Sequence, residues 1–283
     1  MTLARADLAR PTDNGFSARD LDQYLSRIDY SGPLAPDFDT LASLQEQHVA
    51  AIPFEAIDVL LGKVVSLEPA AVRDKLVRRR RGGYCYEQNG LFSEVLTYLG
   101  FEVSPRVARV LWSGRDRDAK HLRTHMALQV KLSGTSWLVD VGFGAAVPNH
   151  PLRLDESDPQ DTPGGRYRVT PQHFSHLVEF DLNGIWRPAY EVFHEPPQSV
   201  DFEVFNWFTS THPESPFARN LILARVTRSG RFTLFDDELT HRPRTGEVTR
   251  RRLGEHELKS VLEQVFGLAV EPDWLPIISR SAS

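Results

Sequence analysis

A change of hydrophobic periodicity at Gly100 is the feature of this sequence that most constrains its fold. Before Gly100, apolar residues recur every three or four positions, which is the spacing of helices that bury one face. The predicted helices cover residues 17–28 with Ser17 as cap, 40–52 with Thr40 as cap and Pro53 as stop, 68–80, and 85–99. After Gly100, short stretches alternate apolar and polar residues between turns, as in a barrel or a sandwich.

The C-terminal part returns to a mixed pattern. Residues 221–235 predict a hairpin around Ser229-Gly230, and residues 255–267 predict an amphipathic helix that ends at Gly267. Residues 147–169 are rich in Pro, Gly and Asp, and we expect them to form a long surface excursion. The order of helices, strands and a small mixed part predicts an α+β fold of three domains.

The segment from His125 to Phe143 predicts a β-hairpin whose register follows from its own pattern. Large apolar residues alternate on both sides of Ser133-Gly134, and a two-residue turn there puts all of them on one face. On the opposite face, His125 then lies diagonal to Asp140, within reach of an imidazole–carboxylate hydrogen bond. Such a pair is the orienting half of a catalytic triad, but it also occurs as a structural pair at a sheet edge.

Cys85 is the only cysteine of the chain, and it stands at the predicted start of a helix. Gly82 and Gly83 precede it, which lets the chain turn sharply and keeps bulk away from the sulfur. The unpaired N–H groups of a helix start favour an anion, so this position suits a reactive thiolate. The alternative is a buried cysteine that acts as a small apolar side chain.

The composition argues against several classes of protein. The 283 residues carry a formal net charge of −5, so we expect neither a nucleic-acid partner nor an anionic membrane surface. A single cysteine rules out an internal disulfide and fits a reducing compartment. The N-terminus lacks the continuous apolar core of a secretory signal, and no apolar run reaches the roughly 18 residues of a membrane span. We therefore expect a soluble, cytoplasmic protein.

Three weaker motifs carry little functional signal. His121 and His125 have a metal-compatible spacing, but no glutamate follows the first of them and the second begins a strand, so we expect no metal. Residues 142–147, GFGAAV, lack the third glycine and the helix of a dinucleotide site. The arginine run at residues 78–81 is predicted to be a solvated helix end.

Five motifs, in order and spacing, resemble those of the arylamine N-acetyltransferases. They are IPFEAIDVLLG at residues 52–62, RRGGYCYEQNG at 80–90, THMALQV at 124–130, WLVDVGFG at 137–144 and STHPESPF at 210–217. The resemblance covers nearly the whole chain and weakens toward the C-terminus. It implies a papain-like cysteine core with an N-terminal helical bundle over residues 1–100, a central antiparallel β-barrel over 101–207 and a C-terminal α/β lid over 208–283.

The same resemblance implies the site and its substrates. Cys85, His125 and Asp140 match the catalytic triad of the family, whose acyl donor is acetyl-coenzyme A and whose acceptors are arylamines, arylhydrazines and N-hydroxyarylamines. Matching positions place Phe54 and Phe143 in the acceptor pocket with Trp207 near its rim, and Thr124, Gly142 and Gly144 close to the coenzyme. The family usually has Asn where this chain has Ala56, which puts in doubt a local side-chain hydrogen bond.

The expected reaction is a ping-pong transfer of acetyl through a thioester on Cys85. Three alternatives stay open at this point. One is a related amide synthase that closes macrolactams with the same triad, another is a cysteine hydrolase of the papain or transglutaminase type, and the third is a non-catalytic binding module. The sequence also leaves open whether the chain is a monomer or a homodimer.

Overall fold

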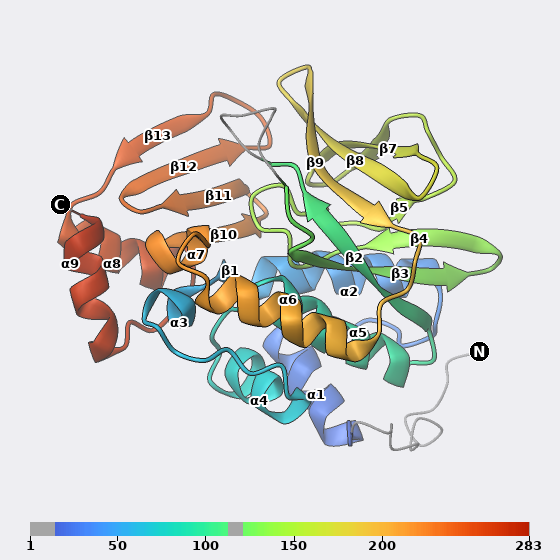
Figure 1. Cartoon of the computed structure of the whole chain (residues 1–283), viewed down its shortest axis with the longest axis horizontal. Coiled ribbons are helices and arrows are strands. Elements are labelled where there is room, and N and C mark those ends of the chain that lie inside the picture. Colours follow the sequence, from blue (N-terminus) through green and yellow to red (C-terminus); the bar gives the residue numbers. More distant parts are fainter. Residues whose placement is uncertain (1–14, 113–120, 283) are drawn as a thin grey trace.

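The computed structural model describes residues 15–112 and 121–282, and it consists of a helical part followed by two antiparallel sheets (Figure 1). The helical part contains α1 (Ala18–Arg27), α2 (Phe38–Ala51), α3 (Ile57–Leu60), α4 (Pro69–Arg73), which continues as a π-helical turn at Asp74–Arg78, and α5 (Cys85–Tyr98). The apolar faces of these helices share one core with the residues of the predicted hairpin.

The sequence predicted caps for the first two helices, and the structure confirms one of them. Ser17 caps α1 as predicted, because its hydroxyl accepts a hydrogen bond from the N–H of Asp20. The predicted cap Thr40 is wrong. α2 begins at Phe38, since the carboxylate of Asp37 accepts the N–H of Thr40 at 2.9 Å, so the helix is capped three residues before the predicted position.

The first sheet has eight strands in the order β5-β4-β3-β2-β9-β8-β7-β6 and curls into a nearly closed barrel, with β5 close to β7. Its interior is filled by the alternate side chains of these strands. The strands are β2 (Glu102–Val110), β3 (His125–Leu132), β4 (Thr135–Val139), β5 (Leu152–Arg153), β6 (Gln160–Thr162), β7 (Gly165–Pro171), β8 (Ser175–Leu182) and β9 (Ile185–Phe193).

The expected surface excursion at residues 147–169 is wrong. This segment supplies β5, β6 and the first part of β7, and its apolar residues Leu152, Tyr167 and Val169 are fully buried in the barrel. Most of the Pro, Gly and Asp residues occupy the connections between these short strands, although Asp161 lies in β6 and Gly165 begins β7. Strands of two or three residues are too short to produce a recognisable alternation, so composition alone misled the prediction.

The second sheet has the order β1-β10-β11-β12-β13, and it joins a strand from the helical part to four strands from the C-terminal part. β1 (Phe54–Glu55) comes from the helical part and pairs with β10 (Ile222–Thr227), which β11 (Gly230–Phe235), β12 (Glu238–Pro243) and β13 (Thr249–Arg252) follow. The predicted hairpin at 221–235 is confirmed, with its two-residue turn at residues 228–229.

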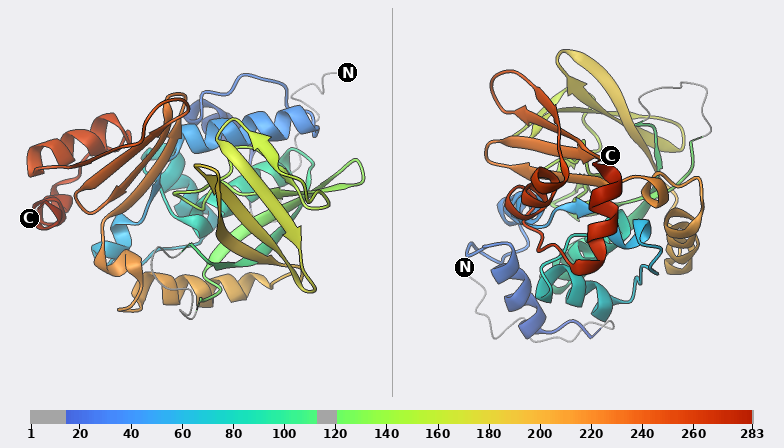
Figure 2. Two further views of the ribbon diagram at one scale, coloured as in Figure 1. Left: turned by 90° about the horizontal axis from the view of Figure 1, so that it is seen from above. Right: turned by 90° about the vertical axis from the view of Figure 1, so that its left-hand side faces the viewer.

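The remaining helices cover two sides of the molecule. α8 (Glu255–Gln264), a 3₁₀ turn at Pro272–Trp274 and α9 (Leu275–Ser281) pack on the face of the second sheet that looks away from the barrel (Figure 2). α6 (Ser199–Thr211) lies along the start of α5, and α7 (Pro216–Arg219) follows it. None of the helices in residues 15–112 and 121–282 is long and apolar enough to cross a membrane.

Helical bundle, barrel and α/β part together confirm the predicted α+β fold class. The division into domains at residues 100/101 and 207/208 stays a prediction. The second of these boundaries falls inside α6, and β1 belongs by its hydrogen bonds to the C-terminal sheet.

Candidate active site

Cys85 is the first residue of α5, as the sequence predicted. The two glycines before it are required by close packing. A Cβ atom on Gly82 would lie 2.2 Å from the carbonyl oxygen of Pro53, and one on Gly83 would lie 2.7 Å from a carboxylate oxygen of Glu87. That carboxylate accepts the N–H of Tyr84 and caps the helix, so the first turn of α5 is tightly defined.

A buried ionic cluster holds the segment in front of Cys85. Arg81, only 3% exposed, contacts Glu55 of β1 at 2.8 Å and Asp58 of α3 at 3.1 Å, while Lys75 contacts Glu87 at 2.7 Å. The prediction of a solvated end for residues 78–81 is therefore wrong for Arg81. The carboxylates that pair with Arg81 lie on β1 and α3, and no local pattern in the arginine run predicts these ion pairs.

The predicted hairpin register is confirmed. Leu132 pairs with Thr135, and the ladder continues to the pair of Leu128 and Val139. The turn residues Ser133 and Gly134 both have positive φ, as a two-residue hairpin turn of type I′ requires. The ladder therefore puts His125 and Asp140 on the face opposite the large apolar residues.

His125 and Asp140 form the predicted hydrogen bond, with Nε2 of His125 2.7 Å from Oδ2 of Asp140. Both side chains are buried, as is Cys85, whose sulfur lies 3.8 Å from the carbonyl oxygen of Thr124. Burial opposes protonation of His125, but the charge of Asp140 and hydrogen bonds to Asp140 and Cys85 outweigh it and raise the pKa of His125 to about 10. The structure thus brings the three predicted residues into one row, with the imidazole between the other two.

Two side-chain amides that the sequence prediction missed hold Asp140 in place, one through its carboxylate and one through its backbone. Nδ2 of Asn89 donates to Oδ1 of Asp140 at 3.0 Å and to the carbonyl oxygen of Met126 at 2.7 Å. Nε2 of Gln45 donates to the backbone oxygen of Asp140 at 3.2 Å. Asn89 lies one helical turn after Cys85, so the spacing of four residues within YCYEQNG was a usable signal. Gln45 had none.

Tyr190 of β9 was also missed, because it reaches the site from a distant strand. The centre of its ring lies 5.0 Å from that of His125. Burial, together with the charge of Asp140, raises the pKa of Tyr190 well above its ordinary value. The hydroxyl is buried without a partner in hydrogen-bonding geometry among the described residues.

The predicted acceptor-pocket residues have different positions. Phe143 lies against the triad, with its ring centre 5.0 Å from that of His125, and Phe54 lies beside Gly144, where a Cβ would come within 3.3 Å of the phenyl ring. Phe217, from the STHPESPF motif, joins them with its ring 5.8 Å from that of Phe54. Trp207 on α6 is 66% exposed and makes no ring contact with these residues in the described part of the chain.

Of the three residues predicted near the coenzyme, Gly142 and Thr124 lie directly against Cys85. The carbonyl of Thr124 faces the thiol, and a Cβ on Gly142 would lie 2.7 Å from the Cα of Cys85. Gly144 has a φ of +78°, which favours glycine, and lies against Phe54. Ala56 is the N-cap residue of α3, and its side chain makes no capping hydrogen bond.

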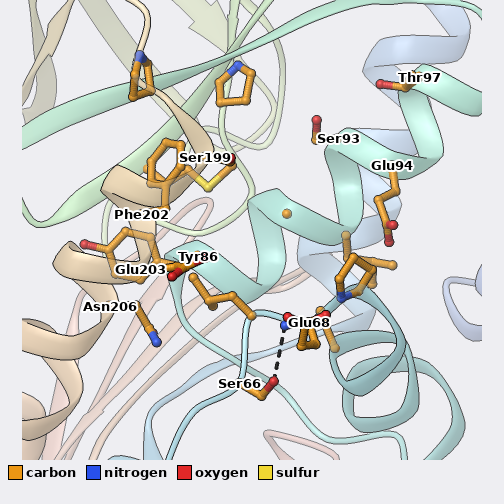
Figure 3. A pocket seen from close by; sticks show the side chains of 18 residues that line it. Ser66, Glu68, Tyr86, Ser93, Glu94, Thr97, Ser199, Phe202, Glu203 and Asn206 are labelled. Atoms are coloured by element: carbon orange, nitrogen blue, oxygen red, sulfur yellow. Dashed lines mark hydrogen bonds between the residues drawn. The ribbon is translucent and has the colours of Figure 1, made fainter. Parts of the chain in front are cut away.

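A cavity of about 620 Å³ opens on an adjoining face of α5, between α5 and α6. Figure 3 shows Ser93, Glu94 and Thr97 on one side of it and Phe202 and Asn206 on the other. Cys85, His125 and Asp140 do not line it. Among the described residues no group of three or more His, Cys, Asp and Glu side chains is placed to hold a metal ion.

The chain matches the family model for N-acetyltransferase over residues 37–275. It is 42% identical over 220 residues to the arylamine N-acetyltransferase of Mycolicibacterium smegmatis, covering 77% of this chain and 80% of that protein. It is 36% identical over 253 residues to the arylamine N-acetyltransferase of Escherichia coli (strain K12), covering 89% of each. The solved structure of Mycobacterium marinum arylamine N-acetyltransferase in complex with CoA is similar with a TM-score of 0.88 at 34% identity, covering 93% of this chain and 100% of that one.

Proposed function

This chain belongs to the arylamine N-acetyltransferase family, and on that basis we propose that it transfers acetyl from acetyl-coenzyme A to arylamines, arylhydrazines or N-hydroxyarylamines through a thioester on Cys85. The observation that carries the proposal is the row of Cys85, His125 and Asp140 at the start of α5. Such a row activates a sulfur nucleophile by pairing it with an imidazolium that a carboxylate orients.

The first half of the reaction moves the acetyl group to the enzyme. The pKa of His125, raised to about 10, keeps the imidazole protonated near neutral pH, where it pairs with the thiolate of Cys85. The thiolate attacks the thioester carbonyl, and a new carbon–sulfur bond forms while the bond to the sulfur of coenzyme A breaks. The leaving thiolate takes the proton of His125, so coenzyme A departs as the free thiol and the imidazole becomes neutral.

The second half returns the site to its starting state. The amino group of the acceptor attacks the acetyl carbonyl on Cys85, and the carbon–sulfur bond breaks as the amide forms. Neutral His125 takes the proton that the nitrogen loses, and Asp140 stabilises the resulting imidazolium. N–H groups at the start of α5 lack helical acceptors and are suited to stabilise the oxyanion in both steps.

Aromatic side chains beside the triad give the site a preference for flat acceptors. We propose that Phe143 and Phe54, together with Phe217, stack on the acceptor ring, because they lie next to His125 and Gly144. Trp207 is proposed as a more distant rim residue.

Thr124, Gly142 and Gly144 are proposed to lie along the coenzyme. Support comes from their positions against Cys85 and Phe54, and from the similarity to the Mycobacterium marinum structure in complex with CoA. Small side chains at these positions let a bulky thioester approach the sulfur.

Mass measurement of the intact protein after incubation with acetyl-coenzyme A tests the proposal. We expect one added acetyl group, located on the peptide that contains Cys85 and removed on addition of an aniline with formation of the anilide. Cys85→Ala should take up no acetyl, whereas the control Thr97→Ala, at an exposed position of the same helix, should behave as the unchanged protein. Folded protein that takes up no acetyl would contradict the proposal, and loss of acetyl as acetate without transfer would favour a hydrolase.

A further inference from the structure

A second cavity, of about 370 Å³, lies between the barrel and the C-terminal sheet. Its walls are the turn at residues 162–165, the end of β8 with residues 180–183, and the turn ends of the C-terminal sheet at residues 226–231 and 242–248. Cys85, His125 and Asp140 do not line it. A volume of this size lies within the range of small-molecule sites.

Arg231 of β11 lines this cavity and is only 4% exposed. Its Nη2 donates to the carbonyl oxygens of Val147 at 3.0 Å and Gly164 at 3.2 Å and contacts the hydroxyl of Tyr167 at 3.1 Å, all of them uncharged groups. Its Nη1 is buried without any hydrogen-bond partner among the described residues. Burying a guanidinium without a negatively charged partner is costly. Among the described residues no carboxylate pairs with Arg231, so an anion bound beside it would offset this cost.

Further positive charge surrounds the same cavity. Arg242 of β12 lies directly opposite Arg231 in the strand register and also lines the cavity, as does Arg244. Burial, together with the charges of Arg250 and Arg231, lowers the pKa of Arg242, as expected where cations gather. Within residues 15–112 and 121–282, the one ion pair of the Arg244 side chain is a distant contact of 3.8 Å with Glu46.

The acidic residue of the lining does not offset these charges. Oδ1 of Asp181 accepts the N–H of Gly184 at 2.7 Å, and its other oxygen faces Arg166, outside the cavity lining, at 3.9 Å. Asn149 stands directly behind Gly164, and its buried Nδ2 also has no partner among the described residues. The wall around Gly164 therefore holds two N–H donors without acceptors.

We propose that this cavity binds a small molecule that carries a phosphoryl group, held by Arg231 and Arg242 and distinct from the acetyl-transfer site. Guanidinium groups match the oxygens of a phosphoryl group in charge and geometry. A phosphoryl group supplies the acceptors that Nη1 of Arg231 lacks and carries up to two negative charges, whereas one carboxylate carries a single charge. The cavity is larger than the anion alone and leaves room for an organic body.

Calorimetric titration of the full chain with pyrophosphate, at constant ionic strength, tests the proposal. We expect saturable binding at one site per chain and at least about tenfold weaker binding by Arg242→Gln, the loss that follows from removing one charge-assisted contact. The control is Arg19→Gln, which makes the same change of charge at an exposed position of α1 and should bind as the unchanged protein. Arg231→Met, which also removes the buried charge, should not bind.

Three results would overturn the inference. They are no saturable binding to the unchanged protein, equal weakening by Arg19→Gln and Arg242→Gln, and tighter binding of citrate than of pyrophosphate. Displacement of pyrophosphate by free coenzyme A would likewise overturn the separation from the acetyl-transfer site. Acetylation of Cys85 is measured independently in the same preparation, so failure of this inference and failure of the proposed reaction are distinguishable.

Discussion

Replacement of Asp140 by Asn tests the electrostatics of the site directly, because it removes one charge and preserves the shape of the side chain. In the unchanged protein, burial disfavours the imidazolium of His125, and the charge and hydrogen bond of Asp140 are the main causes that outweigh it. Without that charge, burial acts against the protonated ring with only Cys85 to support it. We expect the pKa of His125 in Asp140→Asn to fall to its ordinary value or below.

The size of the effect follows from that pKa. A fall from about 10 to the ordinary 6.5 destabilises the protonated imidazole by about 5 kcal/mol, at about 1.36 kcal/mol per pH unit. A raised pKa in the folded state stabilises the fold fully below pH 6.5, and this stabilisation is lost as the pH rises from 6.5 toward about 10. Asp140→Asn should lack this dependence over the same window.

Alkylation of Cys85 by iodoacetamide is the assay, since the chain has no other thiol. We expect rapid alkylation of the unchanged protein throughout the neutral range, because the imidazolium supports the thiolate. Asp140→Asn weakens this support, so alkylation of the variant should be markedly slower at pH 7. Asp39→Asn, an exposed position of α2, serves as control. Equal rates at pH 7 in Asp140→Asn with an intact fold would refute the electrostatic reasoning.

Three further substitutions test the supports of the site. Asn89→Ala removes a charge-assisted hydrogen bond to Asp140. It should lower the free energy of unfolding in urea by about 2–4 kcal/mol and also lower kcat. Unchanged stability and kcat would contradict a positioning role for Asn89. Gly142→Ala puts a Cβ 2.7 Å from the Cα of Cys85. We expect the free energy of unfolding to fall by about 1–3 kcal/mol and the protein mass to show strongly reduced acetylation. Full acetylation would argue against the close approach. Arg81→Met removes the ion-pair partner of the buried carboxylate of Glu55, while Asp58 keeps Lys75, and it should lower the free energy of unfolding by about 3–5 kcal/mol. A change under about 1 kcal/mol would show that the cluster is solvated.

Local patterns in the sequence were sufficient to predict the helix and the hairpin that carry the proposed triad. A strict alternation around Ser133-Gly134 admits one register, because a slip by one residue would expose every large apolar side chain of the hairpin. The face that holds His125 and Asp140 follows from that register alone. The glycines before Cys85 likewise indicated a sharp turn into a helix, which the structure has.

Contacts between segments far apart in the chain were decided only by the tertiary structure. The burial of Arg81 depends on Glu55 and Asp58, and the support of Asp140 depends on Asn89 and a glutamine of α2. The pairing of β1 with β10 joins residues about 170 positions apart. Such contacts leave no periodic trace in either segment, because each segment satisfies its own local pattern whichever partner it meets. Sequence pattern therefore determined where the reactive groups stand on their own elements, and packing decided which groups surround them.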